Sequence, residues 1–216
     1  MTEGVWLVTG VQAAGKSTIA DQLARQFEHG AHIRGGQFYR WAVTGWVHVG
    51  DDRAREARRH LELRYRLAAL TADEYCEAGF TAVVQDNMFG PDVTRWLGSV
   101  AGRPPHLVVL RPSVAVVWQR EQDRHFTTGK TAYRPGGFTP EGLDMELAAT
   151  PRIGLWLDTS AMSPAETVAE ILRRRSEAVV DDALGALPGF GDPMQNSPSW
   201  RRRGLNYFKC RVTLSP

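Results

Sequence analysis

The sequence has few cysteines, almost no excess of charge and no long hydrophobic run. The two cysteines among its 216 residues, Cys76 and Cys210, cannot form a disulfide framework and lack the spacing of metal ligands. No apolar run approaches the roughly 18 residues that a membrane-spanning helix needs. The first residues also lack the basic and apolar regions of a secretory signal. We therefore expect a cytoplasmic protein without a membrane partner.

Positive and negative side chains nearly balance, and the formal net charge is +2. The total charge therefore implies no strongly acidic or basic partner. A local cluster of arginines does occur, at Arg53, Arg55, Arg58 and Arg59. On a helix, such a cluster is more typical of a solvated face than of a nucleic-acid surface, and it gives little support to a nucleic-acid partner.

Five short apolar segments alternate with amphipathic helical patterns. The predicted strands cover residues 5–8, 31–34, 80–84, 107–110 and 153–157. Helices are expected from Ser17 to a stop at Gly30, over 52–78, from about Pro112, and from Ser163, which fits a capping box with Glu166. This alternation predicts an α/β fold with a five-stranded parallel sheet and helices on both faces.

The alternation extends over residues 1–178, which we predict to form one domain. Glycines and prolines interrupt it over residues 126–138, and we expect a mobile lid there. Residues 179–216 are predicted to form an irregular C-terminal tail. The end of this tail is basic and aromatic, and we favour a solvated or body-docked tail over an arm for nucleic acid or a membrane.

The segment from Gly10 to Ser17 reads GVQAAGKS and matches the phosphate-loop pattern G-x-x-x-x-G-K-[ST]. An apolar strand precedes it and an amphipathic helix follows it, which is the context that the pattern requires. Glycines let backbone N–H groups approach phosphate closely, and the helix N-terminus adds a favourable dipole. We predict ATP as the cofactor. The predicted nucleotide-binding residues are Gly10, Gln12, Ala13, Ala14, Gly15, Lys16, Ser17 and Thr18.

Within this loop, Lys16 is predicted to contact the β- and γ-phosphates and to act in catalysis. Ser17 is predicted to ligate Mg²⁺, and Thr18 to contact the α-phosphate. A second Gly-Lys-Thr sequence occurs at 129–131. Arg124 stands where its first glycine should be, and no strand precedes it, so we reject it as a phosphate loop. Contact of Lys130 with phosphate from a closing lid stays open.

Ligands of open α/β sheets bind at the carboxyl ends of the strands. Asp86 follows the third strand and is predicted to be a catalytic base and a second Mg²⁺ ligand. Arg120 and Arg124 share a helix face before the lid, and we expect them to stabilise the transferring phosphoryl group unless they simply pair with surface acids. The predicted acceptor-binding residues are Arg34, Gln37, Phe38, Arg40 and Asn87. For the first four of these, an ordinary amphipathic helix is the alternative.

The order of these motifs resembles the nucleoside-monophosphate-kinase-like group of P-loop proteins. Within that group, the chain looks most similar to small-molecule phosphotransferases such as chloramphenicol phosphotransferase. The resemblance covers about residues 4–175 and rests on the phosphate loop, on Val84-Gln85-Asp86-Asn87, on the arginine-rich segment 120–134 and on Leu157-Asp158-Thr159-Ser160. The resemblance implies a kinase in which the loop at residues 157–160 lies near the adenine of ATP.

One departure from the group concerns the end of the second strand. Members commonly place an aspartate there as a base, whereas this sequence has Gly35 and Gly36. Either Asp86 accepts the proton instead, or the acceptor lies differently, or transfer is impaired. The leading hypothesis is an ATP-dependent kinase that acts on a hydroxyl of a small molecule, with antibiotics among the candidate acceptors. The alternative is a nucleotide-binding regulatory protein with little or no transfer activity.

Overall fold

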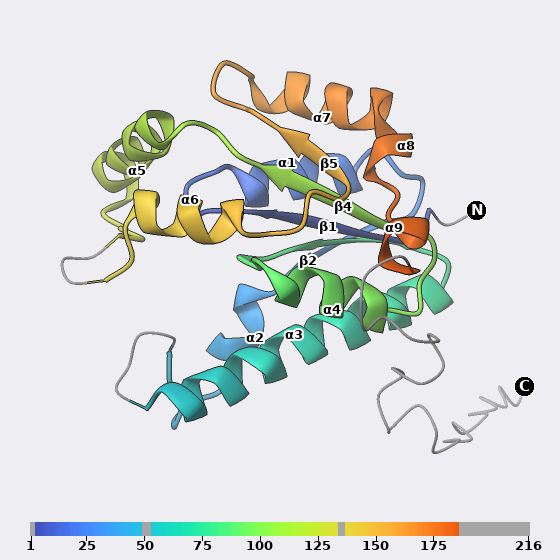
Figure 1. Cartoon of the computed structure of the whole chain (residues 1–216), viewed down its shortest axis with the longest axis horizontal. Coiled ribbons are helices and arrows are strands. Elements are labelled where there is room, and N and C mark those ends of the chain that lie inside the picture. Colours follow the sequence, from blue (N-terminus) through green and yellow to red (C-terminus); the bar gives the residue numbers. More distant parts are fainter. Residues whose placement is uncertain (1–2, 49–52, 134–136, 186–216) are drawn as a thin grey trace, which may run out of the picture.

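A computed structural model describes residues 3–48, 53–133 and 137–185 (Figure 1). Its five strands form one parallel sheet in the order β2-β3-β1-β4-β5, which confirms the predicted fold class. The strands are β1 (Val5–Gly10), β2 (Gly30–Arg34), β3 (Thr81–Gln85), β4 (Pro105–Leu110) and β5 (Leu155–Leu157). The central strand β1 is buried along its whole length, as expected for a strand covered on both faces.

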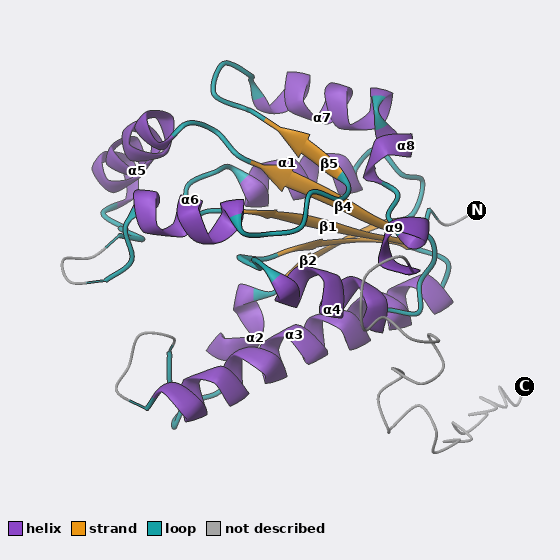
Figure 2. Ribbon diagram, viewed as in Figure 1, coloured by secondary structure: helices purple, strands orange, loops and turns teal. Residues whose placement is uncertain are grey.

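Helices cover both faces of the sheet (Figure 2). On one face lie α1 (Lys16–Ala24) and α7 (Pro164–Arg173), and on the other lie α3 (Ala54–Glu77) and α4 (Pro91–Ser99). The helices α5 (Val114–Thr128) and α6 (Pro140–Ala148) stand at the end of the sheet to which the strands point. Short helices complete the described part: α2 (Gly36–Arg40), α8 (Arg175–Ala178) and α9 (Asp181–Gly185). No helix in this part of the chain has both the length and the apolarity for a membrane crossing.

Several helix ends differ from the sequence prediction. The helix α1 ends at Ala24, and Gly30 begins β2 instead of ending the helix. A Cβ atom at Gly30 would lie 1.8 Å from the Ala24 carbonyl oxygen, so glycine is required there for close packing. The helix expected from Pro112 begins at Val114, because the Ser113 hydroxyl caps it. The predicted capping box of Ser163 and Glu166 is confirmed.

The structure adds α4 and α6, which the periodicity did not predict. Both helices have a proline in the first turn, where its missing N–H has no cost. The predicted lid also begins later than expected, because α5 continues to Thr128 and ends at Gly129 with φ of 66°. Residues 134–136 of that predicted lid lie outside the described residues.

The first residues of the predicted tail pack against the body. The Val180 N–H donates to the Pro105 carbonyl at 3.1 Å, and Asp181 forms an ion pair with Arg103 at 3.1 Å. Val180 and Leu184 are buried. The segment 179–185 is therefore docked at the amino end of β4. The rest of the predicted tail, with Cys210, lies outside the described residues.

Candidate active site

The phosphate loop connects the end of β1 to the start of α1. Ala13 adopts a left-handed backbone with φ of 62°, and Gly15 caps the helix with φ of 96° and no side-chain hydrogen bond. A Cβ atom at Gly10 would lie 2.4 Å from the Leu110 carbonyl oxygen. The glycines at both ends of the loop are therefore required by the backbone path, which brings the N-terminus of α1 to the carboxyl edge of the sheet.

Lys16 is a buried cation at this loop. Its Nζ donates to the Val11 carbonyl oxygen at 2.6 Å. Burial, with the charges of Arg64 and Arg124, lowers the pKa of Lys16 to about 7. Burial and nearby arginines disfavour the protonated form of Lys16, so an anion such as a triphosphate that binds beside it stabilises that form.

Ser17 and Thr18 are both exposed at the start of α1. The Ser17 hydroxyl lies 3.3 Å from the side-chain oxygen of Gln85, at the end of β3. Hydroxyl and amide oxygens suit Mg²⁺, which usually takes only one or two protein ligands beside phosphates and water. Ser17 therefore fits the predicted metal, and Gln85 is a second oxygen that the sequence reasoning missed. In the described residues, no group of three or more His, Cys, Asp or Glu side chains forms a separate metal site.

A cavity of about 520 Å³, here called the phosphate cavity, lies over the loop. It brings together most of the predicted catalytic and nucleotide-binding residues. Its lining consists of Gln12, Ala13, Gly15, Lys16, Ser17, Thr18, Gly36, Tyr39, Arg64, Gln85, Asp86, Asn87, Arg120 and Arg124. Gly10 and Ala14 shape the loop beneath it.

Asp86 forms a buried ion pair with Arg64 from α3. The Arg64 Nε lies 2.9 Å from one carboxylate oxygen, Arg64 Nη2 contacts the other, and the Asn87 N–H donates to the carboxylate at 2.6 Å. Both oxygens of Asp86 are thus engaged, so its predicted role as a magnesium ligand has less support than that of Ser17. Arg64 was not predicted, although its position follows Leu61 by three residues and precedes Ala68 by four on the inner stripe of α3.

The glycines after β2 explain where the carboxylate lies. A Cβ atom at Gly35 would stand 2.0 Å from the Asp86 Oδ2 atom. The register pairs Arg34 with Gln85, so the next residues, Gly35 and Asp86, face each other at the ends of neighbouring strands. The Asp86 side chain therefore occupies the space that a side chain at the end of β2 would need.

Arg120 and Arg124 reach the phosphate cavity from α5. Arg120 donates to the Ala14 carbonyl at 3.2 Å and to the Thr159 carbonyl at 2.8 Å, which links the phosphate loop to the loop after β5. Arg124 pairs with Glu121, and its Nε is buried without a partner among the described residues. An unpaired buried donor beside a lysine is well placed for a phosphate oxygen.

Glu121 and Tyr133 anchor the segment after α5. The buried Glu121 carboxylate accepts from the Thr131 hydroxyl at 2.8 Å and from the Ala132 N–H. Burial raises the pKa of Glu121, but these hydrogen bonds and Arg124 outweigh it and hold the pKa below its ordinary value. The Tyr133 hydroxyl donates to the Gln12 carbonyl at 2.9 Å. The first part of the predicted lid is therefore attached to the phosphate loop. No sequence motif marked either residue.

Most of the predicted acceptor residues lie elsewhere. Phe38 is buried in the core against Trp41, and Arg34 and Arg40 are exposed. With Gln37, these residues line neither of the two cavities that adjoin the phosphate loop. The reason is helical geometry, because Gly36 and Tyr39 share the face of α2 that points to the site. Asn87, by contrast, lines both cavities. In the arginine cluster, Arg53, Arg55 and Arg59 are exposed as predicted, whereas Arg58 is half-buried and paired with Asp92.

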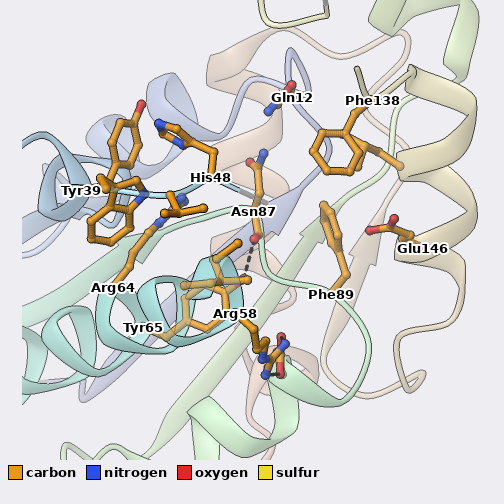
Figure 3. A pocket seen from close by; sticks show the side chains of 16 residues that line it. Gln12, Tyr39, His48, Arg58, Arg64, Tyr65, Asn87, Phe89, Phe138 and Glu146 are labelled. Atoms are coloured by element: carbon orange, nitrogen blue, oxygen red, sulfur yellow. Dashed lines mark hydrogen bonds and ion pairs between the residues drawn. The ribbon is translucent and has the colours of Figure 1, made fainter. Parts of the chain in front are cut away.

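A second cavity of about 400 Å³, here called the aromatic cavity, adjoins the phosphate cavity (Figure 3). The two share Gln12, Tyr39, Arg64 and Asn87. The remaining lining is Trp46, Val47, His48, Ala57, Arg58, Leu61, Tyr65, Phe89, Asp92, Phe138, Leu143 and Glu146. These side chains come from α3, α4 and α6 and from the segments between elements, so no single stretch of sequence could reveal them.

Residues 5–135, more than half of the chain, match the AAA domain family. The chain belongs to the AAA domain family. Solved structures with the same fold include a gluconokinase from Sinorhizobium meliloti 1021 (19% identity, 86% of this chain and 98% of that chain, TM-score 0.54). A sugar kinase from Janibacter sp. HTCC2649 is similar (18% identity, 82% and 96%, TM-score 0.54).

A shikimate kinase from Bacteroides thetaiotaomicron also shares the fold (13% identity, 80% and 97%, TM-score 0.52). No curated protein matches the sequence. The fold of this AAA-family chain is thus the P-loop fold of small-molecule kinases.

Proposed function

We propose that this AAA-family protein is an ATP-dependent kinase that transfers the γ-phosphoryl group of ATP to a hydroxyl of a small molecule. The supporting observation is that the phosphate cavity and the aromatic cavity adjoin, with Asp86 lining the first and Asn87 lining both. A protein that only binds nucleotide needs the first cavity alone. Neighbours named gluconokinase and shikimate kinase support a small hydroxylated acceptor, and hydroxylated antibiotics stay among the candidates.

In the proposed reaction, the acceptor oxygen attacks the γ-phosphorus while the bond to the β–γ bridging oxygen of ADP breaks. The hydroxyl proton passes to Asp86. Lys16, Arg120 and Arg124 offset negative charge on the phosphoryl oxygens. Mg²⁺, held by Ser17 with Gln85 nearby, would neutralise phosphate charge when bound. Because this kind of transfer depends mainly on positioning, a carboxylate paired with Arg64 is adequate as a proton acceptor.

The experiment combines the protein with ATP, Mg²⁺ and a panel of hydroxylated antibiotics, nucleosides and sugars. Mass spectrometry should detect a product heavier by one phosphoryl group. Lys16→Ala should lower transfer by roughly 10²- to 10³-fold, because it removes a charge at the transferring group. Arg55→Ala is the control, since Arg55 is an exposed cation on α3 that lines neither cavity.

The same experiment tests the alternative, a regulatory nucleotide-binding protein, which the lack of an aspartate after β2 favours. Retention of ATP without any phosphorylated product would support that alternative. A normal transfer rate in Lys16→Ala would show that the assigned site is wrong.

A further inference from the structure

The aromatic cavity has ring-bearing walls on two sides. Tyr39 and His48 stand on one side, Phe89 and Phe138 stand on the other, and Asn87 lies between them (Figure 3). Tyr39 packs edge-on against His48, with ring centroids 5.2 Å apart, so this wall is preformed. Aromatic faces at opposite sides of a cavity favour a flat ring between them.

The cations at this cavity are already neutralised. Arg58 makes two hydrogen bonds to Asp92, at 2.8 and 2.7 Å, and a third to Glu62 at 2.8 Å. Arg64 is engaged with Asp86 in the same two-point manner. No other lysine or arginine occurs among the described residues that line the cavity. A carboxylate or phosphate on the ligand would therefore have to displace a protein carboxylate that is already paired.

The unsatisfied polar atom at the boundary of the cavities is an acceptor. The side-chain oxygen of Gln12 is buried and has no hydrogen-bond partner among the described residues. Such an atom needs a donor, which a hydroxyl supplies and an ionised carboxylate does not. The other charge at the rim is Glu146, an exposed carboxylate that repels anions.

We propose that the acceptor is an alcohol that carries an aromatic ring and no negative charge. Its ring lies between the walls of Tyr39 and Phe89, and its hydroxyl donates near Gln12 before transfer. The role of this ligand as phosphoryl acceptor rests on the proposed kinase function. Its binding preference is a property of the cavity and can be measured without turnover.

The test compares phenyl β-D-glucoside with two relatives. Methyl β-D-glucoside lacks the aromatic ring, and phenyl β-D-glucuronide carries a carboxylate in place of the C6 hydroxymethyl group. Each is titrated calorimetrically into protein saturated with Mg²⁺ and a non-hydrolysable ATP analogue. Phenyl β-D-glucoside should bind about tenfold more tightly than either relative. Tighter binding of the glucuronide, equal binding of the methyl glucoside, or failure of both phenyl compounds to bind would overturn the proposal.

A variant pair locates the binding. Phe89→Leu keeps an apolar side chain without the ring, and it should remove most of the preference for the phenyl over the methyl glucoside. Phe126→Ala is the control, because Phe126 is 92% exposed and lines neither cavity. An unchanged preference in Phe89→Leu would contradict the proposed ring position.

Nucleotide affinity, measured first on each variant, shows that the fold is intact. If the unmodified protein does not bind nucleotide, the proposed kinase function itself is refuted. A reversed order of probes with nucleotide bound would refute only the acceptor class.

Discussion

The phosphate cavity and the aromatic cavity share a wall but differ in what they leave unsatisfied. In the phosphate cavity the buried Arg124 Nε is a donor without a partner among the described residues, and Lys16 is a cation whose charge is disfavoured by burial. In the aromatic cavity the arginines are paired, and the unpaired atom at its boundary with the phosphate cavity is an acceptor, the Gln12 Oε1 atom. The first cavity therefore suits an anion and the second suits a neutral hydrogen-bond donor.

The side chains shared by the two cavities explain how the anion site is kept separate from the site for a neutral ligand. Arg64 lines both cavities, yet its charge is matched by the buried carboxylate of Asp86. The pair leaves no free cation from Arg64 in the aromatic cavity and places the Asp86 carboxylate in the phosphate cavity, where the proposed reaction releases a hydroxyl proton.

The largest effect is expected for Asp86→Asn. Loss of the proton acceptor should lower turnover by roughly 10²- to 10⁴-fold. It should also destabilise the protein by about 3 to 5 kcal/mol, because Arg64 is left buried without its partner. The double variant Asp86→Asn with Arg64→Met should recover stability in urea denaturation but not turnover. Recovery of turnover in the double variant would show that Asp86 serves only to pair Arg64.

The adjacent glycines after β2 provide a matched pair. Gly35→Ala should lower turnover by about 10²-fold, because its Cβ would lie 2.0 Å from Asp86 Oδ2 and must displace the carboxylate. Gly36→Ala should lower turnover far less, although Gly36 also lines the phosphate cavity, since its Cβ would meet no protein atom nearer than 3.7 Å and leaves Asp86 in place. Steady-state kinetics checks both variants. Equal rates in the two would remove the link between Gly35 and the position of Asp86.

The lowered pKa of Lys16 predicts a pH dependence of nucleotide binding. With a pKa of about 7 in the free protein and a higher one beside phosphates, Lys16 must take up a proton when ATP binds above pH 7. Affinity should fall roughly fivefold between pH 7 and pH 8. Calorimetry in buffers of different ionisation enthalpy should detect uptake of almost one proton at pH 8. The same uptake in Lys16→Ala would assign it to another group.

The smallest effect is expected at the anchored segment after α5. Tyr133→Phe removes the hydrogen bond to the Gln12 carbonyl, a loss of about 0.5 to 1 kcal/mol. Weaker closure should raise ATP hydrolysis by water relative to phosphoryl transfer by roughly threefold. The ratio of phosphate released to acceptor phosphorylated measures this. Tyr75→Phe is the control, because Tyr75 lines neither cavity, and an equal change there would exclude a specific role for Tyr133.

Short-range patterns in the sequence by themselves determined the five strands of a parallel sheet, the helices α1, α3, α5 and α7, and the phosphate loop. Each of these depends on neighbours along the chain: apolar runs of strand length, and two glycines within the six residues before Lys16. The same reasoning expected Asp86 and Asn87 at the edge where parallel strands end, and both line the phosphate cavity. Phe38 and Arg40 were also expected near the acceptor but line neither cavity, because only the packed orientation of α2 shows that Gly36 and Tyr39 face the site.

Only the tertiary structure decided which side chains meet at long range. Arg64 and Asp86 are 22 residues apart, and Tyr133 and Gln12 are 121 residues apart. No periodicity encodes such pairs, because they depend on how α3 and the segment after α5 pack on the sheet. The charge of each cavity follows from these pairings and not from composition, since an arginine that binds an anion and one that is already neutralised look the same in sequence.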